Sequence, residues 1–222
     1  WLTGTYDCTT QLVLSGTVPT AAAPMQWVGA DASGNILRPK FNETNMSLDL
    51  TDYPKIVCSA NVEMYLTNEH TSYKCMSFEN TSSSYSQQSI IESTTSDIDI
   101  QNWTGCFFKV ATSNSNGSEV LIMANSNLTM CEFVMASGNF QSVLRFTSAG
   151  QLDNCRVKGP GTSSVSGNQD GVAINTGNIH INNTVIYNLP GDGLFHESTN
   201  DRQAITITNS SIINCAGNGI DI

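Results

Sequence analysis

Two acidic residues toward the C-terminal end of the chain have the spacing of a paired-carboxylate site. Asp170 and Asp192 each directly precede a glycine and a short apolar segment, at equivalent points of two neighbouring repeats. If the repeats stack, the two side chains lie about 5 Å apart, the separation used by retaining glycosidases. Such a pair can work as acid and base, or bind Ca²⁺ through its carboxylate oxygens. Further candidates close by in the sequence are His196, Glu197, Arg202 and Asp221.

A turn role accounts for the same two residues more simply. In Asp-Gly and Asn-Gly turns the side chain accepts hydrogen bonds from nearby backbone N–H groups. At the equivalent point of the following repeat the residue before the glycine, Gly219, is Asn218, which has an amide in place of the carboxylate. This pattern favours backbone capping over catalysis, and His196, at the end of a short apolar segment, is typical of a structural histidine.

The elements that must position these residues are short strands in a repeat of about 25 residues. Residues 179–186 (IHINNTVI) align with residues 205–212 (ITITNSSI) at a separation of 26. Each segment is followed by a glycine and a second short apolar strand. Because of this repeat, we expect the second strands to place the following residues at corresponding positions, give or take one residue: Val120, Val143, Val172, Leu194 and Ile220.

This repeat predicts a solenoid. Each unit holds two or three strands with alternating polarity between Gly, Asn and Ser turns, and none is long enough for the crossover helix of a βαβ unit. One unit cannot bury its apolar face alone, whereas units stacked at about 4.8 Å form parallel sheets around one core. We expect one continuous domain, with irregular coils in residues 1–97 and regular coils in residues 98–222. Residues 15–47 and 79–97 are expected to be loops.

The pattern Ile-x-Ile-x-Asn-x-x-Ile, followed by Gly-Ile, resembles the right-handed parallel β-helix repeat of the pectin-lyase-like superfamily. The resemblance covers residues 98–222 and implies an all-β, right-handed parallel β-helix. It says little about chemistry, because the superfamily includes lyases, hydrolases, epimerases, phage tailspikes, adhesins and structural proteins. The sequence signatures of polygalacturonases are absent, and so is a clustered Arg/Lys pair like that of pectate lyases.

The resemblance also implies an asparagine ladder, in which amides at one tight turn stack inward from coil to coil. Asparagine suits such a turn because it tolerates positive φ. Met130 interrupts the aligned series, which consists of Asn102, Asn154, Asn183 and Asn209.

Composition excludes some functions and favours an extracellular setting. The 222 residues carry a net charge of −10, with 13% charged residues, and Asn, Ser and Thr together account for 72 positions. The chain has no basic patch for nucleic acid and no apolar run of the roughly 18–20 residues that a membrane helix needs. An acidic, Lys-poor chain with scattered cysteines is typical of a secreted or cell-surface protein.

Eight Asn-x-Ser/Thr sequons support that setting. At Asn102 and Asn209 we favour the ladder over a glycan, because a buried amide cannot carry one. The remaining candidates for N-glycosylation are Asn42, Asn45, Asn80, Asn116, Asn127 and Asn182.

Seven cysteines are spread along the chain without a CxxC pair, so the sequence indicates neither a metal cluster nor a redox motif. Cys131 and Cys155 occupy the same repeat position 24 residues apart, which suggests a disulfide between stacked coils. Cys58 and Cys75, which close a short loop, form a second candidate pair.

We therefore expect a secreted, glycosylated solenoid with a structural or surface-display role and no cofactor other than Ca²⁺. Residues 218–222 end within a predicted strand that has no cap, so we expect head-to-tail stacking of solenoid ends into a filament, or further chain beyond this point. The main alternative is a carbohydrate-binding or carbohydrate-active β-helix, such as a polysaccharide lyase or glycoside hydrolase, that uses the region around Asp170 and Asp192. A viral or phage receptor-binding fibre is a further alternative.

Overall fold

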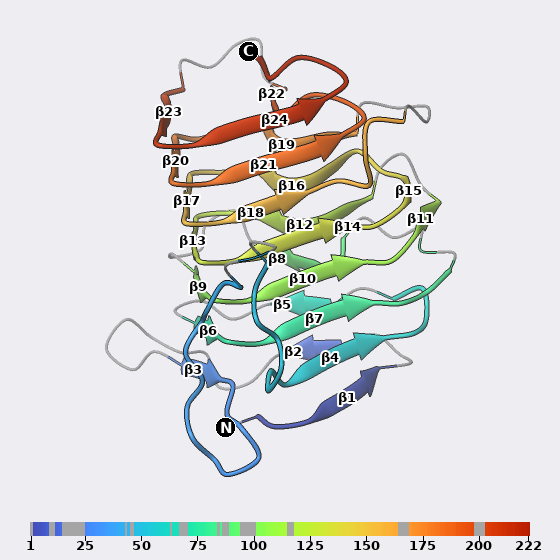
Figure 1. Cartoon of the computed structure of the whole chain (residues 1–222), viewed down its shortest axis with the longest axis vertical. Helices are drawn as coiled ribbons and strands as arrows, with labels where there is room; N and C mark the ends of the chain where they lie inside the picture. Colours follow the sequence, from blue (N-terminus) through green and yellow to red (C-terminus); the bar gives the residue numbers. More distant parts are fainter. Residues whose placement is uncertain are drawn as a thin grey trace.

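The computed structural model describes residues 2–8, 12–14, 25–42, 44, 47–62, 64–66, 71–83, 85, 89–93, 101–114, 118–163, 169–197 and 203–222. Within these ranges the chain forms strands, bridges and turns but no helix. The strands stack in parallel as a β-solenoid with about 26 residues per turn, so the predicted all-β solenoid is confirmed. Figure 1 shows the coils stacked along the long axis, with the N-terminal coil at the bottom and the C-terminal coil at the top.

Three long sheets form the walls of the solenoid, and we name each by its outermost strands. The β1–β24 sheet consists, in spatial order, of β1 (Thr5–Cys8), β4 (Lys55–Cys58), β7 (Ser77–Asn80), β10 (Phe107–Val110), β14 (Glu132–Met135), β18 (Arg156–Lys158), β21 (Val185–Leu189) and β24 (Ser211–Cys215). The β2–β25 sheet consists of β2 (Leu12–Leu14), β5 (Met64–Leu66), β8 (Ile91–Ser93), β12 (Glu119–Met123), β16 (Ser142–Phe146), β19 (Asp170–Ile174), β22 (Leu194–His196) and β25 (Ile220–Asp221). The β3–β23 sheet consists of β3 (Met25–Val28), β6 (Thr71–Lys74), β9 (Gln101–Thr104), β13 (Ser126–Thr129), β17 (Gly150–Asp153), β20 (Ile179–Asn182) and β23 (Ile205–Thr208). Two short strands, β11 (Ser113–Asn114) and β15 (Gly138–Asn139), pair outside these walls.

Each turn of the solenoid passes through the three walls in the same order. In a central coil, β12 is followed by β13 and then by β14, with two-residue corners between them. Asn125 lies in the first corner and Met130 in the second, and both adopt positive φ, of 39° and 53°. Alternation places every second side chain of a strand inside, as in β13, where Leu128 is buried and Asn127 is only partly so. Short strands joined by such tight corners therefore produce a narrow core closed on three sides.

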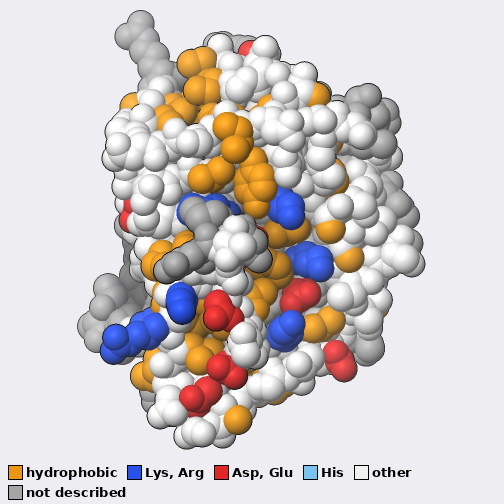
Figure 2. Space-filling view, in the orientation of Figure 1, with side chains coloured by type: hydrophobic (Ala, Val, Ile, Leu, Met, Phe, Trp, Pro, Cys, Tyr) orange, Lys and Arg blue, Asp and Glu red, His pale blue; other side chains and the backbone are white. Residues whose placement is uncertain are grey.

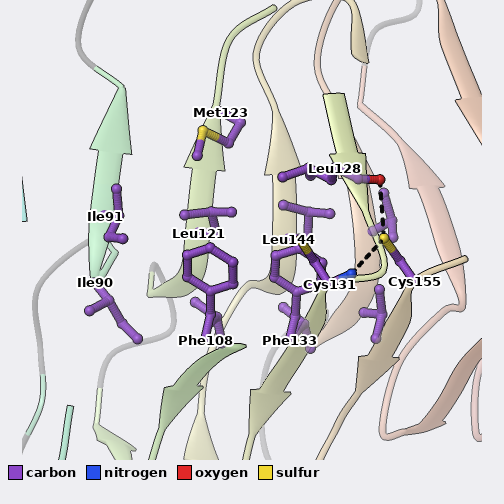
Figure 3. Packing of buried hydrophobic residues seen from close by; sticks show 14 of the residues in the cluster. Ile90, Ile91, Phe108, Leu121, Met123, Leu128, Cys131, Phe133, Leu144 and Cys155 are labelled. Carbon is purple, nitrogen blue, oxygen red and sulfur yellow. Dashed lines mark hydrogen bonds between the residues drawn. The ribbon is translucent and has the colours of Figure 1, made fainter. Parts of the chain in front are cut away.

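The core is a set of side-chain stacks that run from coil to coil. Trp103 stacks on Tyr73 with ring centroids 4.0 Å apart, and Phe108 lies between Phe78 and Phe133 at 5.4 and 5.1 Å. Figure 3 shows the same arrangement for Phe108 and Phe133, below the aliphatic side chains of Leu121 and Leu144. Offset-stacked aromatic pairs of this kind add to the stability gained from burial alone.

The predicted register of the regular coils is confirmed. Ile179 pairs with Ile205, and Ile186 pairs with Ile212. In the β2–β25 sheet the aligned residues are Leu121, Leu144, Val172, Leu194 and Ile220, so the positions expected for Val120 and Val143 were one residue early.

The N-terminal part is more regular than expected. All three sheets include strands from the described part of residues 1–97, and β3 lies in the range 15–47 that was expected to be a loop. β8 lies toward the end of the range 79–97, where Ile90 and Ile91 had been expected to belong to an irregular coil. β3 pairs with β6, and β8 pairs with β5 and β12. The expectation failed because these strands are three or four residues long and lie among polar residues, where alternation gives little signal.

The asparagine ladder was predicted only in part. Asn154, Asn183 and Asn209 do occupy one turn position at positive φ, together with Met130, but Gly105 and not Asn102 fills that position in the earlier coil. Glycine adopts positive φ without a side-chain penalty and so replaces asparagine there. The amides are also not buried, since Asn183 and Asn209 are exposed and Asn183 donates to Asn154 along the outer surface. The argument against glycans at Asn102 and Asn209, which required burial, is therefore wrong.

All seven cysteines are free thiols in the structure, so neither predicted disulfide is formed. Cys131 and Cys155 do stack in adjacent coils, and the Cys131 N–H donates to the Cys155 sulfur over 3.4 Å (Figure 3). Parallel side chains in register keep the strand spacing of about 4.8 Å between Cβ atoms, beyond the 3.5–4.5 Å of a disulfide. Cys58 lies in β4, opposite Cys8 in the strand register, whereas Cys75 lies in the corner after β6. The two cysteines of the second predicted pair therefore lie on different parts of the coil.

The described residues between 31 and 54 leave the coil and cross the outer face of the β1–β24 sheet. The Leu48 N–H donates to the buried Glu132 carboxylate over 2.7 Å, and the Arg156 guanidinium lies 4.7 Å from the centre of the Phe41 ring. Figure 2 shows this face, where acidic and basic side chains mix in the lower half and hydrophobic side chains gather above them. Part of this wall is therefore covered by the chain itself.

Candidate functional site

Asp170 and Asp192 lie where the sequence predicted, at stacked positions of neighbouring coils. The Asp192 N–H donates to Asp170 Oδ1 over 2.9 Å, and the Asn218 N–H donates in the same way to Asp192 Oδ1. Each carboxylate thus caps a backbone N–H of the next coil, as the turn interpretation predicted. Both side chains are committed to the backbone in this arrangement, which makes them poorly placed to act on a substrate.

The surroundings of Asp170 alter its acidity. Burial raises the pKa of this carboxyl to about 6, and the negative charges of Asp192, Glu197 and Asp221 act in the same direction. The hydrogen bond from the Asp192 backbone partly offsets these effects. Asp170 itself is only 2% exposed, which is the burial that raises its pKa.

The structure adds three residues to this cluster that the sequence analysis did not single out. Arg145 Nε donates to Glu119 Oε1 over 2.8 Å, and another guanidinium nitrogen of Arg145 lies 2.6 Å from Glu197 Oε2. Gln141 Nε2 donates to the second oxygen of Glu197 over 3.1 Å. A charged residue within the apolar strand 142–146 was the available signal for Arg145, but its partners come from other coils. Arg145 therefore neutralises part of the acidic cluster.

Of the remaining predicted site residues that the structure describes, only Asp221 lies near enough to this cluster for its charge to act on Asp170. His196 Nε2 lies 3.1 Å from Gln203 Oε1, and Asp221 is exposed opposite Phe195 in the register. Arg202 lies outside the described residues. Among the residues that are described, no three His, Cys, Asp or Glu side chains are grouped so that they could hold a metal ion. The Ca²⁺ site stays a prediction.

A second candidate is the outer surface of the β3–β23 sheet, which forms the left edge of the molecule in Figure 1. Alternation turns every second side chain of its strands outward, and these side chains form two straight columns because the strands pair in register. We call this surface the polar face. Its first column consists of Asn102, Asn127, Gln151, His180 and Thr206, and its second column of Thr104, Thr129, Asp153, Asn182 and Thr208.

Hydrogen bonds between coils hold the second column in place. Asn182 Nδ2 donates to Asp153 Oδ1 over 2.7 Å, and Thr208 Oγ1 donates to Asn182 Oδ1 over 2.9 Å. In the first column, Asn127 Nδ2 donates to Asn102 Oδ1 over 3.2 Å, whereas Gln151 and His180 are exposed. The polar face therefore combines a fixed row of side chains with a row that is open to solvent.

Two hollows lie side by side on this face. One, of about 280 Å³, is lined by residues that include Asn127, Gly150, Gln151 and His180. The other, of about 340 Å³, is lined by Gln151, His180, Ile181, Asn182, Thr206 and Thr208. Gln151 and His180 line both, so the hollows form one track across successive coils. Side-chain amides and hydroxyls both donate and accept hydrogen bonds, which suits a neutral ligand rich in hydroxyl groups.

The predicted glycan sites differ in accessibility. Asn80 is buried, its Nδ2 donates to the Ala60 carbonyl over 3.1 Å and its Oδ1 accepts from the Ser82 N–H, so this fold has no room for a glycan there. Asn42 and Asn102 are exposed, while Asn127 and Asn182 are half-buried. Asn45 and Asn116 lie outside the described residues.

No protein-family model, curated protein or solved structure matches this chain. In the described part of the chain no helix is long and apolar enough to cross a membrane. The parallel β-solenoid is thus established by its own strand pairing alone.

Proposed function

We propose that this chain is an extracellular β-solenoid that binds a neutral polysaccharide through its polar face. The observation that carries the proposal is the double column of amide and hydroxyl side chains, repeated over five coils and hollowed along Gln151 and His180. Sugar hydroxyls donate and accept at once, and the polar face offers both kinds of partner at regular intervals.

The charge of the face supports a neutral ligand. Asp153 is its one carboxylate within the two columns, and that side chain accepts a hydrogen bond from Asn182. The chain as a whole has a net charge of −10, which opposes the approach of acidic polymers. The acidic cluster on the β2–β25 sheet suits binding less well, because Glu119 and Asp170 are each only 2% exposed.

Location outside the cell rests on composition. The low share of charged residues and the exposed sequons at Asn42 and Asn102 support a secreted, glycosylated protein with a display role. The likeness of the repeat to the pectin-lyase-like superfamily, which includes polysaccharide-cleaving enzymes, points toward carbohydrate as well. Self-association through the solenoid ends stays a prediction, which light scattering on the purified protein tests.

Binding to a glycan array, followed by calorimetric titration of the best neutral ligand, tests the proposal. Gln151→Ala and His180→Ala should each weaken binding roughly tenfold, because both side chains line the two hollows. Ser211→Ala is the matched control, since Ser211 is an exposed polar residue on a different wall. Failure to bind any neutral glycan, or equal losses in the control, would contradict the proposal.

A further inference from the structure

We infer that the ligand is an extended β-1,4-linked glycan that lies along the solenoid axis, with about one sugar to each coil. The inference rests on the proposed function and adds the linkage class of the ligand and its direction on the protein. It follows from the spacing of the columns, the course of the hollows and the rigidity of one column.

The columns run parallel to the axis because the register carries no offset from coil to coil. In the first column Asn102 pairs with Asn127, Asn127 with Gln151, Gln151 with His180, and His180 with Thr206. Neighbouring strands lie about 4.8 Å apart, so the five positions span roughly 19 Å. A straight polymer with a similar repeat would meet an equivalent side chain at every coil.

The hollows extend in the same direction. The first draws its lining from the coils of Asn127, Gln151 and His180, and the second from those of Gln151, His180 and Thr206. Together they make a track across four consecutive coils, from β13 to β23. A ligand that lay along a strand instead would leave most of this track empty.

The dimensions of the track favour a β-1,4 linkage between the sugars of the ligand. Sugars in a fully extended β-1,4 chain advance by nearly the spacing of one coil, whereas α-1,4-linked chains curl and advance less for each sugar. The two columns are about 7 Å apart across the strand, which lets side chains reach the hydroxyls on both edges of a flat ribbon. Asp153, Asn182 and Thr208 hold one another in place, so little side-chain freedom is lost when a ligand binds.

The experiment is a calorimetric titration of the intact protein with two oligosaccharide series, β-1,4-linked glucose oligomers of two to six sugars and the α-1,4-linked oligomers of equal length. We expect the affinity for the β-1,4 series to rise at least about tenfold from two to four sugars and then level off. The α-1,4 series should gain little with length. Thr206→Ala, at one end of the track, should weaken binding of the hexamer more than binding of the dimer.

The outcomes separate this inference from the proposed function. Equal binding of both series would overturn the linkage class, and an affinity that no longer rises beyond two sugars would overturn the lengthwise arrangement; either result leaves carbohydrate binding intact. Binding on the array of a neutral glycan without β-1,4 linkages, with neither series bound, would overturn the linkage class alone. If no neutral glycan binds, the inference and the proposed function both fail.

Discussion

At the scale of one residue, Asp170 shows that a buried carboxylate can cap the backbone of a solenoid and still lower its stability at neutral pH. The side chain accepts the backbone N–H of Asp192, yet burial and neighbouring negative charges raise its pKa to about 6. A carboxyl group with a raised pKa in the folded state holds its proton there at pH values where the unfolded chain has lost it. Its contribution to stability is therefore full below the unfolded pKa and is lost as pH rises toward 6.

Asp170→Asn should make the protein more stable at pH 7.5, by up to about 3 kcal/mol in the free energy of unfolding. The amide oxygen can still accept the Asp192 N–H, and the charge that burial disfavours is gone. Urea unfolding measured from about pH 4 to pH 7.5 should show a gain that grows through this range. Asp31→Asn is the control, because hydrogen bonds from Asn35 and Ser33 lower the pKa of that exposed carboxyl, and removing its charge should give no such gain. A variant of Asp170 that is less stable than the wild type at pH 7.5 would contradict the prediction.

At the scale of elements, the corner between the β3–β23 and β1–β24 sheets repeats one hydrogen-bonding device with three residue types. The Cys131 N–H donates to Cys155 Sγ, the Cys155 N–H to Thr184 Oγ1, and the Thr184 N–H to Ser210 Oγ. Each of these side chains also donates to the carbonyl two residues earlier, over 3.4 Å for Cys155 and 3.0 Å for Thr184. Cysteine, threonine and serine are thus interchangeable here as donors and acceptors, which explains why cysteines stack without forming a bond.

This corner predicts different effects for two substitutions of the buried Cys155. Cys155→Ser keeps a donor and an acceptor at the position, so it should be tolerated. Cys155→Ala leaves the Cys131 N–H without its partner and should cost about 1–3 kcal/mol more of unfolding free energy than the serine variant. Chemical denaturation of both variants at one pH measures the difference. Equal stability of the two variants would show that the thiol acts only by filling space.

At the scale of the whole molecule, the three continuous sheets and the stacked core join the coils into one body. Phe108 lies at 0% exposure between Phe78 and Phe133, in the middle of the stack. Each coil contacts only its neighbours, so the stability of one coil depends on the coils stacked on either side of it. Loss of a central side chain should therefore weaken coils that do not touch it.

Phe108→Ala should cost about 3–5 kcal/mol of unfolding free energy, because it removes a fully buried ring and leaves a cavity. We also expect faster alkylation of the buried Cys155 thiol, two coils away, as measured by mass spectrometry under native conditions. Ile213→Ala, at a position that is 53% exposed, should change neither quantity. Alkylation that speeds up at Cys106 but not at Cys155 would show that the coils open separately.

The sequence by itself determined the period, the parallel stacking and the register of the later coils, because alternation and turn residues repeat there without interruption. The repeat predicted the pairing of Ile179 with Ile205 and the stacking of Asp170 and Asp192 in neighbouring coils. It did not determine which residues meet where coil lengths vary, since aligned core residues are separated by 28 positions from Leu144 to Val172 and by 22 from Val172 to Leu194.

Only the tertiary structure decided the contacts that depend on those variable lengths. It brought Arg145 between Glu119 and Glu197, moved Asn102 from the turn to the polar face, and buried Asn80. The polar face itself was visible in the sequence only as scattered Asn, Gln, His and Thr residues. Its columns exist because the β3–β23 strands pair in register, and the side chains of neighbouring coils become neighbours only when the coils stack.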